Sequence, residues 1–141
     1  MVDAVTDEWQ PEDIPPAARL FMRVHKNWFD NGEINPGVFR NVGEGMSTDW
    51  EKYSDAERTR QRAKKTPEEN AVIALVVGEV RGVPGQTVVH TPLKPDGTKE
   101  GKEREGNRAH TDVVGEKKKD PEVRKALKRM CVLVLRYAYD G

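Results

Sequence analysis

Residues 20–25 read Leu-Phe-Met-Arg-Val-His, and this stretch decides the fold that we expect. Its side chains alternate with the period of two that is typical of a β-strand. One face of the strand carries only apolar side chains, namely Leu20, Met22 and Val24. The other face carries Phe21 beside two polar residues, Arg23 and His25. The sequence therefore predicts a strand that buries one face in a core and presents the other as a sheet surface or as the floor of a cleft.

Three further stretches predict strands. Residues 72–80 (VIALVVGEV) are rich in β-branched side chains and suit a covered central strand, after one helical turn that begins at Thr66. Residues 86–90 and 107–115 follow glycine-containing segments and read as extended structure. We therefore expect a small, mainly antiparallel sheet of about three to five strands.

The clearest helix of the chain begins at Asp120, a residue type that caps helices, with Pro and Glu directly after it. Apolar residues recur at helical spacing on one face, at Val123, Leu127, Met130 and Val134. Basic residues occupy much of the opposite side, at Arg124, Lys125, Lys128 and Arg129. The predicted fold class is α+β, with the sheet packed on this C-terminal helix.

Two segments outside this core are strongly polar. Residues 1–16 form an acidic leader without Lys or Arg, and residues 94–106 (KPDGTKEGKEREG) form a charged loop punctuated by glycine. We expect neither segment to supply a core face, so we predict a flexible leader and a mobile loop. Residues 17–141 would then form a single α+β domain.

Composition narrows the class of protein further. Of the 141 residues, 35% are hydrophobic and 34% are charged, and Lys plus Arg equals Asp plus Glu, so no net charge steers the chain toward nucleic acid or a membrane. The single cysteine, Cys131, excludes an internal disulfide and fits a reducing compartment. The leader has no apolar stretch typical of a signal peptide, and no apolar run approaches the length of a membrane span. We expect a cytoplasmic protein that does not contact membranes.

Motifs for cofactors and for well-known catalytic sites are absent from the sequence. It has no phosphate-binding glycine loop followed by Lys-Ser/Thr, no nucleophile elbow and no Cys-x-x-Cys pair. The three histidines, His25, His90 and His110, lie far apart, and their spacing predicts no zinc site. We therefore expect neither a metal nor a cofactor.

Five residues could still line one cleft of a small, metal-independent enzyme. Arg23 and His25 share a strand face, and Asn107, His110 and Lys117 come from one later segment. Arginine and lysine would stabilise negative charge while the histidines move protons. We assign catalytic roles to Arg23, His25 and His110 and ligand binding to Asn107 and Lys117. The substrate would contain phosphate, as RNA or a nucleotide does.

Other roles for these residues stay open. Asn107 can make a turn, and His110 can form a hydrogen bond within the fold without any catalytic function. A nucleotide-transferring site built on Arg23 and Ser47 is a further variant of the enzyme hypothesis.

Several motifs resemble a group of uncharacterised bacterial proteins, and the resemblance covers most of residues 20–129. The motifs are LFMRVH at 20–25, PGVFR at 36–40, MSTD at 46–49, VVHTPL at 88–93 and NRAHTDVVGEK at 107–117. In that group the step from Pro-Leu to Asn-x-x-His is short, whereas here the charged loop lengthens it and Glu116 precedes the lysine. The resemblance implies a bacterial origin and a shared fold, and it implies no activity.

The uneven distribution of charge favours a binding or assembly module. Residues 58–65 and residues 117–129 are basic, in contrast to the acidic leader. We predict a bacterial intracellular module that acts through a protein partner, with Arg124 and Lys128 among the contact residues. Nucleic acid is a second partner class, reached through residues 58–65 or through the basic C-terminal helix. The small enzyme acting on a phosphate-containing substrate is the alternative, and the sequence leaves open whether the protein is an enzyme.

Overall fold

The computed structural model describes residues 9–95 and 105–138, and they form an α+β fold as predicted. Six strands make one antiparallel sheet in the order β6-β7-β4-β1-β5-β8, and β2 and β3 form a separate hairpin. The strands are β1 (Arg19–His25), β2 (Phe29–Asp30), β3 (Glu33–Ile34), β4 (Met46–Trp50), β5 (Asn70–Val76), β6 (Thr87–His90), β7 (His110–Val114) and β8 (Val132–Leu135). The α-helices are α1 (Ala56–Gln61), α2 (Val77–Arg81) and α4 (Pro121–Met130), and short 3-10 helices span Lys26–Trp28, Pro36–Val38 and Pro67–Glu69.

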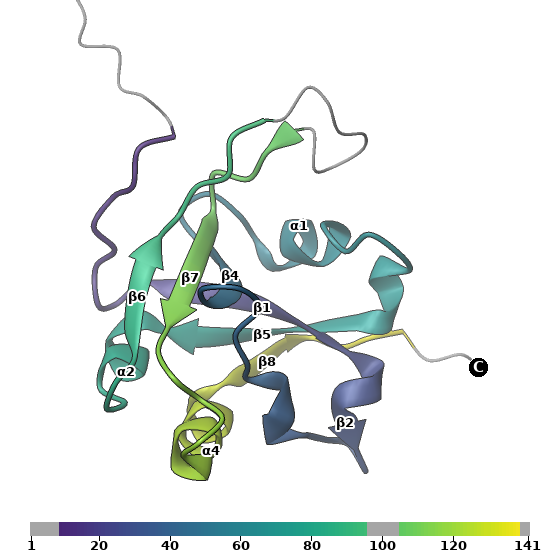
Figure 1. The fold of residues 1–141 in the computed structure, drawn as a ribbon. Helices are drawn as coiled ribbons and strands as arrows, with labels where there is room; N and C mark the ends of the chain where they lie inside the picture. The colour runs from purple at the N-terminus through teal and green to yellow at the C-terminus, as the bar shows by residue number, and fades with distance from the viewer. Residues whose placement is uncertain (1–8, 96–104, 139–141) are drawn as a thin grey trace, which may run out of the picture.

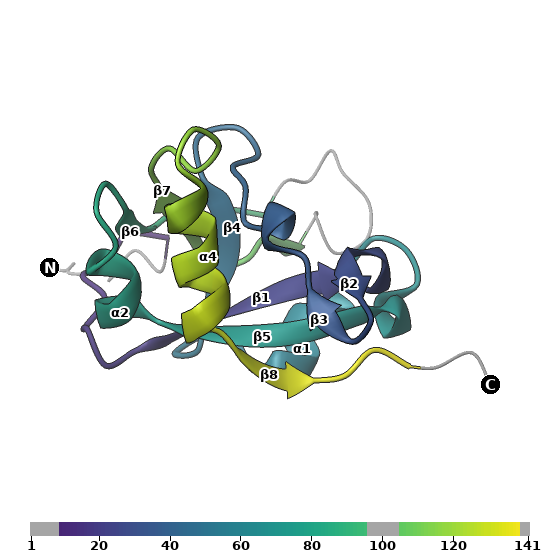
Figure 2. The same cartoon turned by 90° about the horizontal axis from the view of Figure 1, so that it is seen from below.

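The alternation in β1 separates two layers, as the sequence predicted. Leu20, Met22 and Val24 are buried in the main core together with Val123 and Leu127 of α4. On the other face Phe21 packs in a smaller cluster with residues of β5, under α1. The two helices therefore cover opposite faces of the sheet, α1 above it in Figure 1 and α4 in front of it when the molecule is seen from below in Figure 2.

Helix α4 begins as predicted and ends earlier. Asp120 caps it by accepting a hydrogen bond from the backbone N–H of Glu122. The helix stops at Met130, and Val134 lies in strand β8 instead of on the helical face. The four residues after Cys131 are all valine or leucine, which favours a strand, and this strand forms a ladder with β5. The prediction that the helix continues to Val134 was wrong.

Residues 72–80 are a strand only in their first part. Strand β5 is covered on both faces, with Val72 and Ala74 in one cluster and Ile73 and Leu75 in the other, which confirms the expected central strand. From Val77 the chain turns into α2, contrary to the prediction.

Backbone contacts with the first residues of the domain explain why β5 ends there. The N–H of Val77 still donates to the carbonyl of Ala18, the residue opposite it in the register between β1 and β5, whereas the N–H of Gly78 donates to the carbonyl of Pro16, one residue out of that register. Val77 and Val80 then point into the core at helical spacing. A long-range contact of this kind leaves no signal in the local sequence.

The polar segments are described only in part. Residues 1–8 of the leader and residues 96–104 of the charged loop lie outside the described residues, so their predicted mobility stays a prediction. Within the described part of the leader, Ile14 is buried in the main core and the backbone N–H of Glu12 donates to Nδ1 of His90. The leader thus contributes a core residue, which the sequence did not predict. None of the described helices is long and apolar enough to cross a membrane.

Candidate functional site

A cavity of about 510 Å³ lies on the face of the sheet that α4 does not cover. Strands β1, β4 and β7 form its floor, and the end of α1 and the connection between β6 and β7 form its sides. The residues that line it are Phe21, Arg23, Ser47, Thr48, Asp49, Thr59, Arg62, Lys64, Pro92, Leu93, Lys94, Gly106, Asn107 and His110. Pockets of this size commonly hold small molecules.

The strand register brings the polar floor together. Asp49 of β4 pairs with Phe21 of β1 on one side and with His110 of β7 on the other. Because side chains of directly paired residues lie on the same face of a sheet, these three form one row across the floor. Ser47 lies two residues before Asp49 and therefore on the same face, where it pairs with Asp112.

Asp49 is a buried carboxylate held by several donors. Its Oδ2 accepts from the Thr59 hydroxyl at 2.8 Å, and its Oδ1 accepts from Nδ2 of Asn107 at 2.8 Å. Nε of Arg62 lies 3.5 Å from Oδ2. These contacts tie α1 and the segment before β7 to the sheet, so Asp49 fixes both sides of the cavity.

Arg23 extends from β1 into the same site. Its Nη1 donates to the backbone carbonyl of Thr59 at 2.8 Å. Burial lowers the pKa of the Arg23 guanidinium, and the nearby Asp49 opposes this effect. An arginine keeps its charge at neutral pH even after such a shift, so Arg23 places a cation on the cavity floor.

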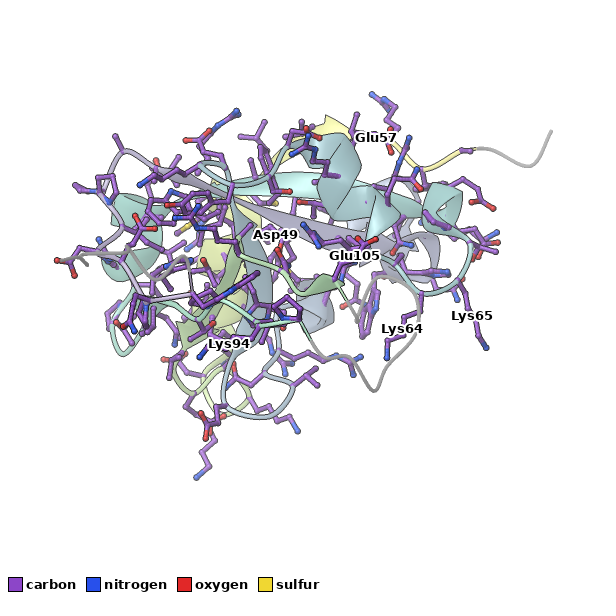
Figure 3. All side chains as sticks on the ribbon, turned by 90° about the horizontal axis from the view of Figure 1, so that it is seen from above. Asp49, Glu57, Lys64, Lys65, Lys94 and Glu105 are labelled. Atoms are coloured by element: carbon purple, nitrogen blue, oxygen red, sulfur yellow. The ribbon has the colours of Figure 1, made fainter. Side chains whose placement is uncertain are left out.

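Basic side chains outnumber acidic ones around the cavity. Among the described residues, four cationic side chains line it, namely Arg23, Arg62, Lys64 and Lys94, against one carboxylate, that of Asp49. Figure 3 looks down on this face and labels Asp49, Lys64 and Lys94, with Glu105 on the same face. Guanidinium groups in a cavity attract anions, and their planar shape suits phosphate oxygens.

His110 contacts the Ser47 hydroxyl through a defined ring nitrogen. Nε2 of His110 lies 3.2 Å from Oγ of Ser47. Nδ1 lies 3.0 Å from the backbone carbonyl of Thr91 and 2.9 Å from its hydroxyl, which itself donates to Asp112. Since the carbonyl can only accept, Nδ1 carries the proton in the neutral ring, and Nε2 is left to accept from Ser47. This arrangement can remove a proton from the serine hydroxyl.

The structure brings three of the predicted site residues together and places another elsewhere. Arg23, Asn107 and His110 line one cavity. His25 lies outside it: its Nδ1 accepts from the backbone N–H of Asn27, and its Nε2 lies 3.3 Å from the Glu69 carboxylate. Contacts of Glu69 with Lys26, Thr66 and His25 lower its pKa to about 2. The strand places His25 on the same face as Arg23 but beyond the end of the cavity.

The remaining predicted binding residues also lie away from the cavity. Lys117 is buried, and its Nζ donates to Asn41 Oδ1 at 2.6 Å, to the Gly115 carbonyl at 2.9 Å and to the carbonyl of Val113 at 3.1 Å. Burial lowers the pKa of Lys117 to about 8. Arg124 and Lys128 lie on α4, which covers the other face of the sheet.

Several residues of the site were not predicted. Asp49 and Thr91 were not among the candidates, and Thr59 and Arg62 were covered only as part of the basic segment 58–65, although all four contribute to the cavity or orient its groups. A polar alternation in residues 46–50 (MSTDW) would have placed Ser47 and Asp49 on one strand face. No local signal indicates that Thr91 lies beside His110.

Comparisons with known proteins assign no family to the chain. No protein-family model, curated protein or solved structure matches the chain. Within the described ranges, no group of three His, Cys, Asp or Glu side chains could hold a metal ion.

Proposed function

We propose that this cavity binds a phosphate-containing small molecule, such as a nucleotide, and that His110 transfers a proton in a reaction on that ligand. The proposal follows the enzyme hypothesis from the sequence, with the site made from Arg23, Asn107 and His110 and without His25 and Lys117. The observation that carries it is one cavity that combines four basic side chains with a histidine whose Nε2 is free to act as a base toward Ser47.

The cationic side chains of the cavity favour an anionic, phosphate-containing ligand. Asp49 balances only part of the positive charge of Arg23 and Arg62, because one carboxylate serves two guanidinium groups. Nε of Arg62 is buried and makes no hydrogen bond among the described residues. A bound phosphate would supply the missing negative charge and further acceptors. Such groups also stabilise the charge that develops when a phosphate ester is attacked.

The apolar part of the wall favours a ligand that is more than a phosphate. Phe21, Pro92 and Leu93 line the same cavity as the cations. Small-molecule pockets typically combine an apolar wall with a few placed polar groups. A nucleotide has a flat base that can pack against the apolar wall and a phosphate that can bind the polar groups.

Binding of adenosine 5′-monophosphate, measured by calorimetry, tests the proposal, with adenosine as the ligand without phosphate. Arg62→Gln removes a cation from the cavity and should weaken binding of the monophosphate by about tenfold or more. Arg58→Gln removes a cation from the exposed side of the same helix region, where Arg58 pairs with Asp55, and should leave binding unchanged. Equal binding of adenosine and its monophosphate, or equal effects of the two substitutions, would contradict the proposal.

A second candidate function, contact with a protein partner, is favoured by strand β8. This strand is at one end of the sheet order, and the residues Val132, Leu133 and Val134 are 62%, 40% and 37% exposed. Exposed apolar edge strands readily accept another strand. A second copy of the chain would supply the same apolar strand in return.

Sedimentation velocity tests this second candidate. Val132→Lys should abolish a dimer of the wild type, and Val89→Lys, at an exposed position of the opposite edge strand β6, should preserve it. A wild-type protein that stays monomeric at high concentration would remove a second copy as the partner.

A further inference from the structure

We infer that Ser47 is the nucleophile of the cavity and bonds covalently to phosphorus during the reaction, an inference that rests on the proposed function. The substrate class is then a phosphate ester that carries a nucleoside on one oxygen.

Ser47 combines exposure with a rigid position. Ser47 is exposed and lines the cavity, while its neighbours Met46 and Thr48 are buried. Pairing with β7 continues on both sides of it, so the backbone cannot easily move the hydroxyl away from His110. Precise placement of this kind is what a nucleophile needs.

The hydrogen bonds of His110 orient it toward Ser47. Both oxygens of Thr91 that contact Nδ1 act as acceptors, because the Thr91 hydroxyl gives its own proton to Oδ2 of Asp112. In its neutral form the ring therefore presents an unprotonated Nε2 to the serine, and the acceptors at Nδ1 stabilise the imidazolium that forms when Nε2 takes the proton.

The hydrogen-bonded series Ser47–His110–Thr91–Asp112 requires a glycine at position 45. A Cβ at position 45 would lie 2.9 Å from Cβ of Asp112, closer than side chains tolerate. The glycine thus lets Asp112 keep its place beside Thr91. Asp112 and Thr91 are positioning residues, since neither lines the cavity.

The reaction that this geometry permits has two balanced steps. Oγ of Ser47 forms a bond to phosphorus while the bond from phosphorus to the leaving oxygen breaks, and the serine proton passes through Nε2 of His110 to that oxygen. Water then attacks the same phosphorus with His110 as the base, the bond to Oγ breaks, and the proton returns to Ser47. The basic residues of the cavity stabilise the charge in both steps.

The 4-nitrophenyl ester of thymidine 5′-monophosphate tests the inference, because its good leaving group speeds the first step. Wild-type protein should release nitrophenolate in a burst of about one equivalent and carry a thymidylyl group on the peptide with Ser47, as seen by mass spectrometry. Ser47→Ala should lose both signals. His110→Gln should slow the burst by about 100-fold or more. Thr87→Ala, which removes a hydroxyl at an exposed position of β6 outside the cavity lining, should behave as wild type.

The outcomes separate this inference from the proposed function. If Ser47→Ala keeps the turnover of the wild type, or if turnover proceeds without an adduct or a burst, water is the nucleophile and the inference fails while the proposed function stands. If the monophosphate binds but the ester is never cleaved, the nucleophile is also overturned and only the binding half of the proposal remains. If neither binding nor cleavage occurs, the proposed function fails as well.

Discussion

Nε2 of His110 lies 3.2 Å from Oγ of Ser47, although 63 residues separate the two in the sequence. The ladder between β4 and β7 brings the two side chains together, because it pairs Ser47 with Asp112 and Asp49 with His110. The same ladder sets Asp49 beside Asn107, which follows the loop that enters β7. One strand pairing thus assembles both the acid-base pair and the buried carboxylate beneath the cavity.

The contact between Asn107 and Asp49 predicts a charge-dependent loss of stability. Asn107→Asp would place a second carboxylate against a buried one and should destabilise the protein at neutral pH by more than Asn107→Ala, which leaves Asp49 without one donor and should cost about 1–3 kcal/mol. Urea denaturation measures both. The excess cost of Asn107→Asp should shrink at about pH 4, where the introduced carboxyl can be protonated. An excess that does not change with pH would contradict this explanation.

Lys117 predicts a pH dependence of folding. Its pKa in the folded protein is about 8, below the ordinary 10.5, so the folded state releases this proton first. The unfolded state binds more protons between these two values, and the contribution of Lys117 to the free energy of unfolding rises with pH there and is level below about pH 8. The advantage of the wild type over Lys117→Met should therefore increase from about pH 8 to about pH 10 in urea denaturation. Lys119→Met, at an exposed position, is the control, and the same trend in both variants would contradict the assignment.

Helix α4 predicts a strong difference between its two faces. Leu127 is buried in the core, so Leu127→Ala should lower the free energy of unfolding by about 2–5 kcal/mol. Lys125 is exposed beside Glu122, so Lys125→Ala should change it by no more than about 0.5 kcal/mol. Chemical denaturation compares them directly. Equal midpoints would mean that α4 does not pack as described.

Thr91 predicts an effect on catalysis without an effect on binding. Thr91→Val removes the hydroxyl that joins His110 to Asp112 but keeps the backbone carbonyl that also accepts from Nδ1. Cleavage of the thymidylyl ester should show kcat reduced by about tenfold with KM unchanged, because Thr91 does not line the cavity. A change confined to KM would indicate that Thr91 shapes the binding site instead.

Local patterns were enough to predict much of the fold. The alternation in residues 20–25 gave the two faces of β1, and the residues around Asp120 gave the start of α4. The predictions failed where a distant contact decides the local structure, as at Gly78, whose N–H donates to the carbonyl of Pro16, out of the register between β1 and β5. β-Branched residues also permit either structure when the tertiary context is unknown.

The candidate site was predictable only within single segments. The alternation of a strand predicts that Arg23 and His25 share one face of the sheet. It does not predict that the cavity includes Arg23 and ends before His25. The position of His110 beside Ser47 depends on the register between distant strands, which one sequence does not specify. Lys117 has the residue type of an anion-binding group, yet its burial among carbonyl and amide oxygens gives it a structural role.

The most direct test of the site is a nitrogen-15 NMR titration of the histidine rings with adenosine 5′-monophosphate. The structure predicts that the neutral His110 ring carries its proton on Nδ1, and that the nucleotide shifts the Nε2 signal together with the backbone amides of Ser47 and Asn107, while the amide of Lys125 on α4 stays unchanged. A proton on Nε2 in the neutral ring, or a nucleotide that leaves all three pocket signals in place, would contradict the account.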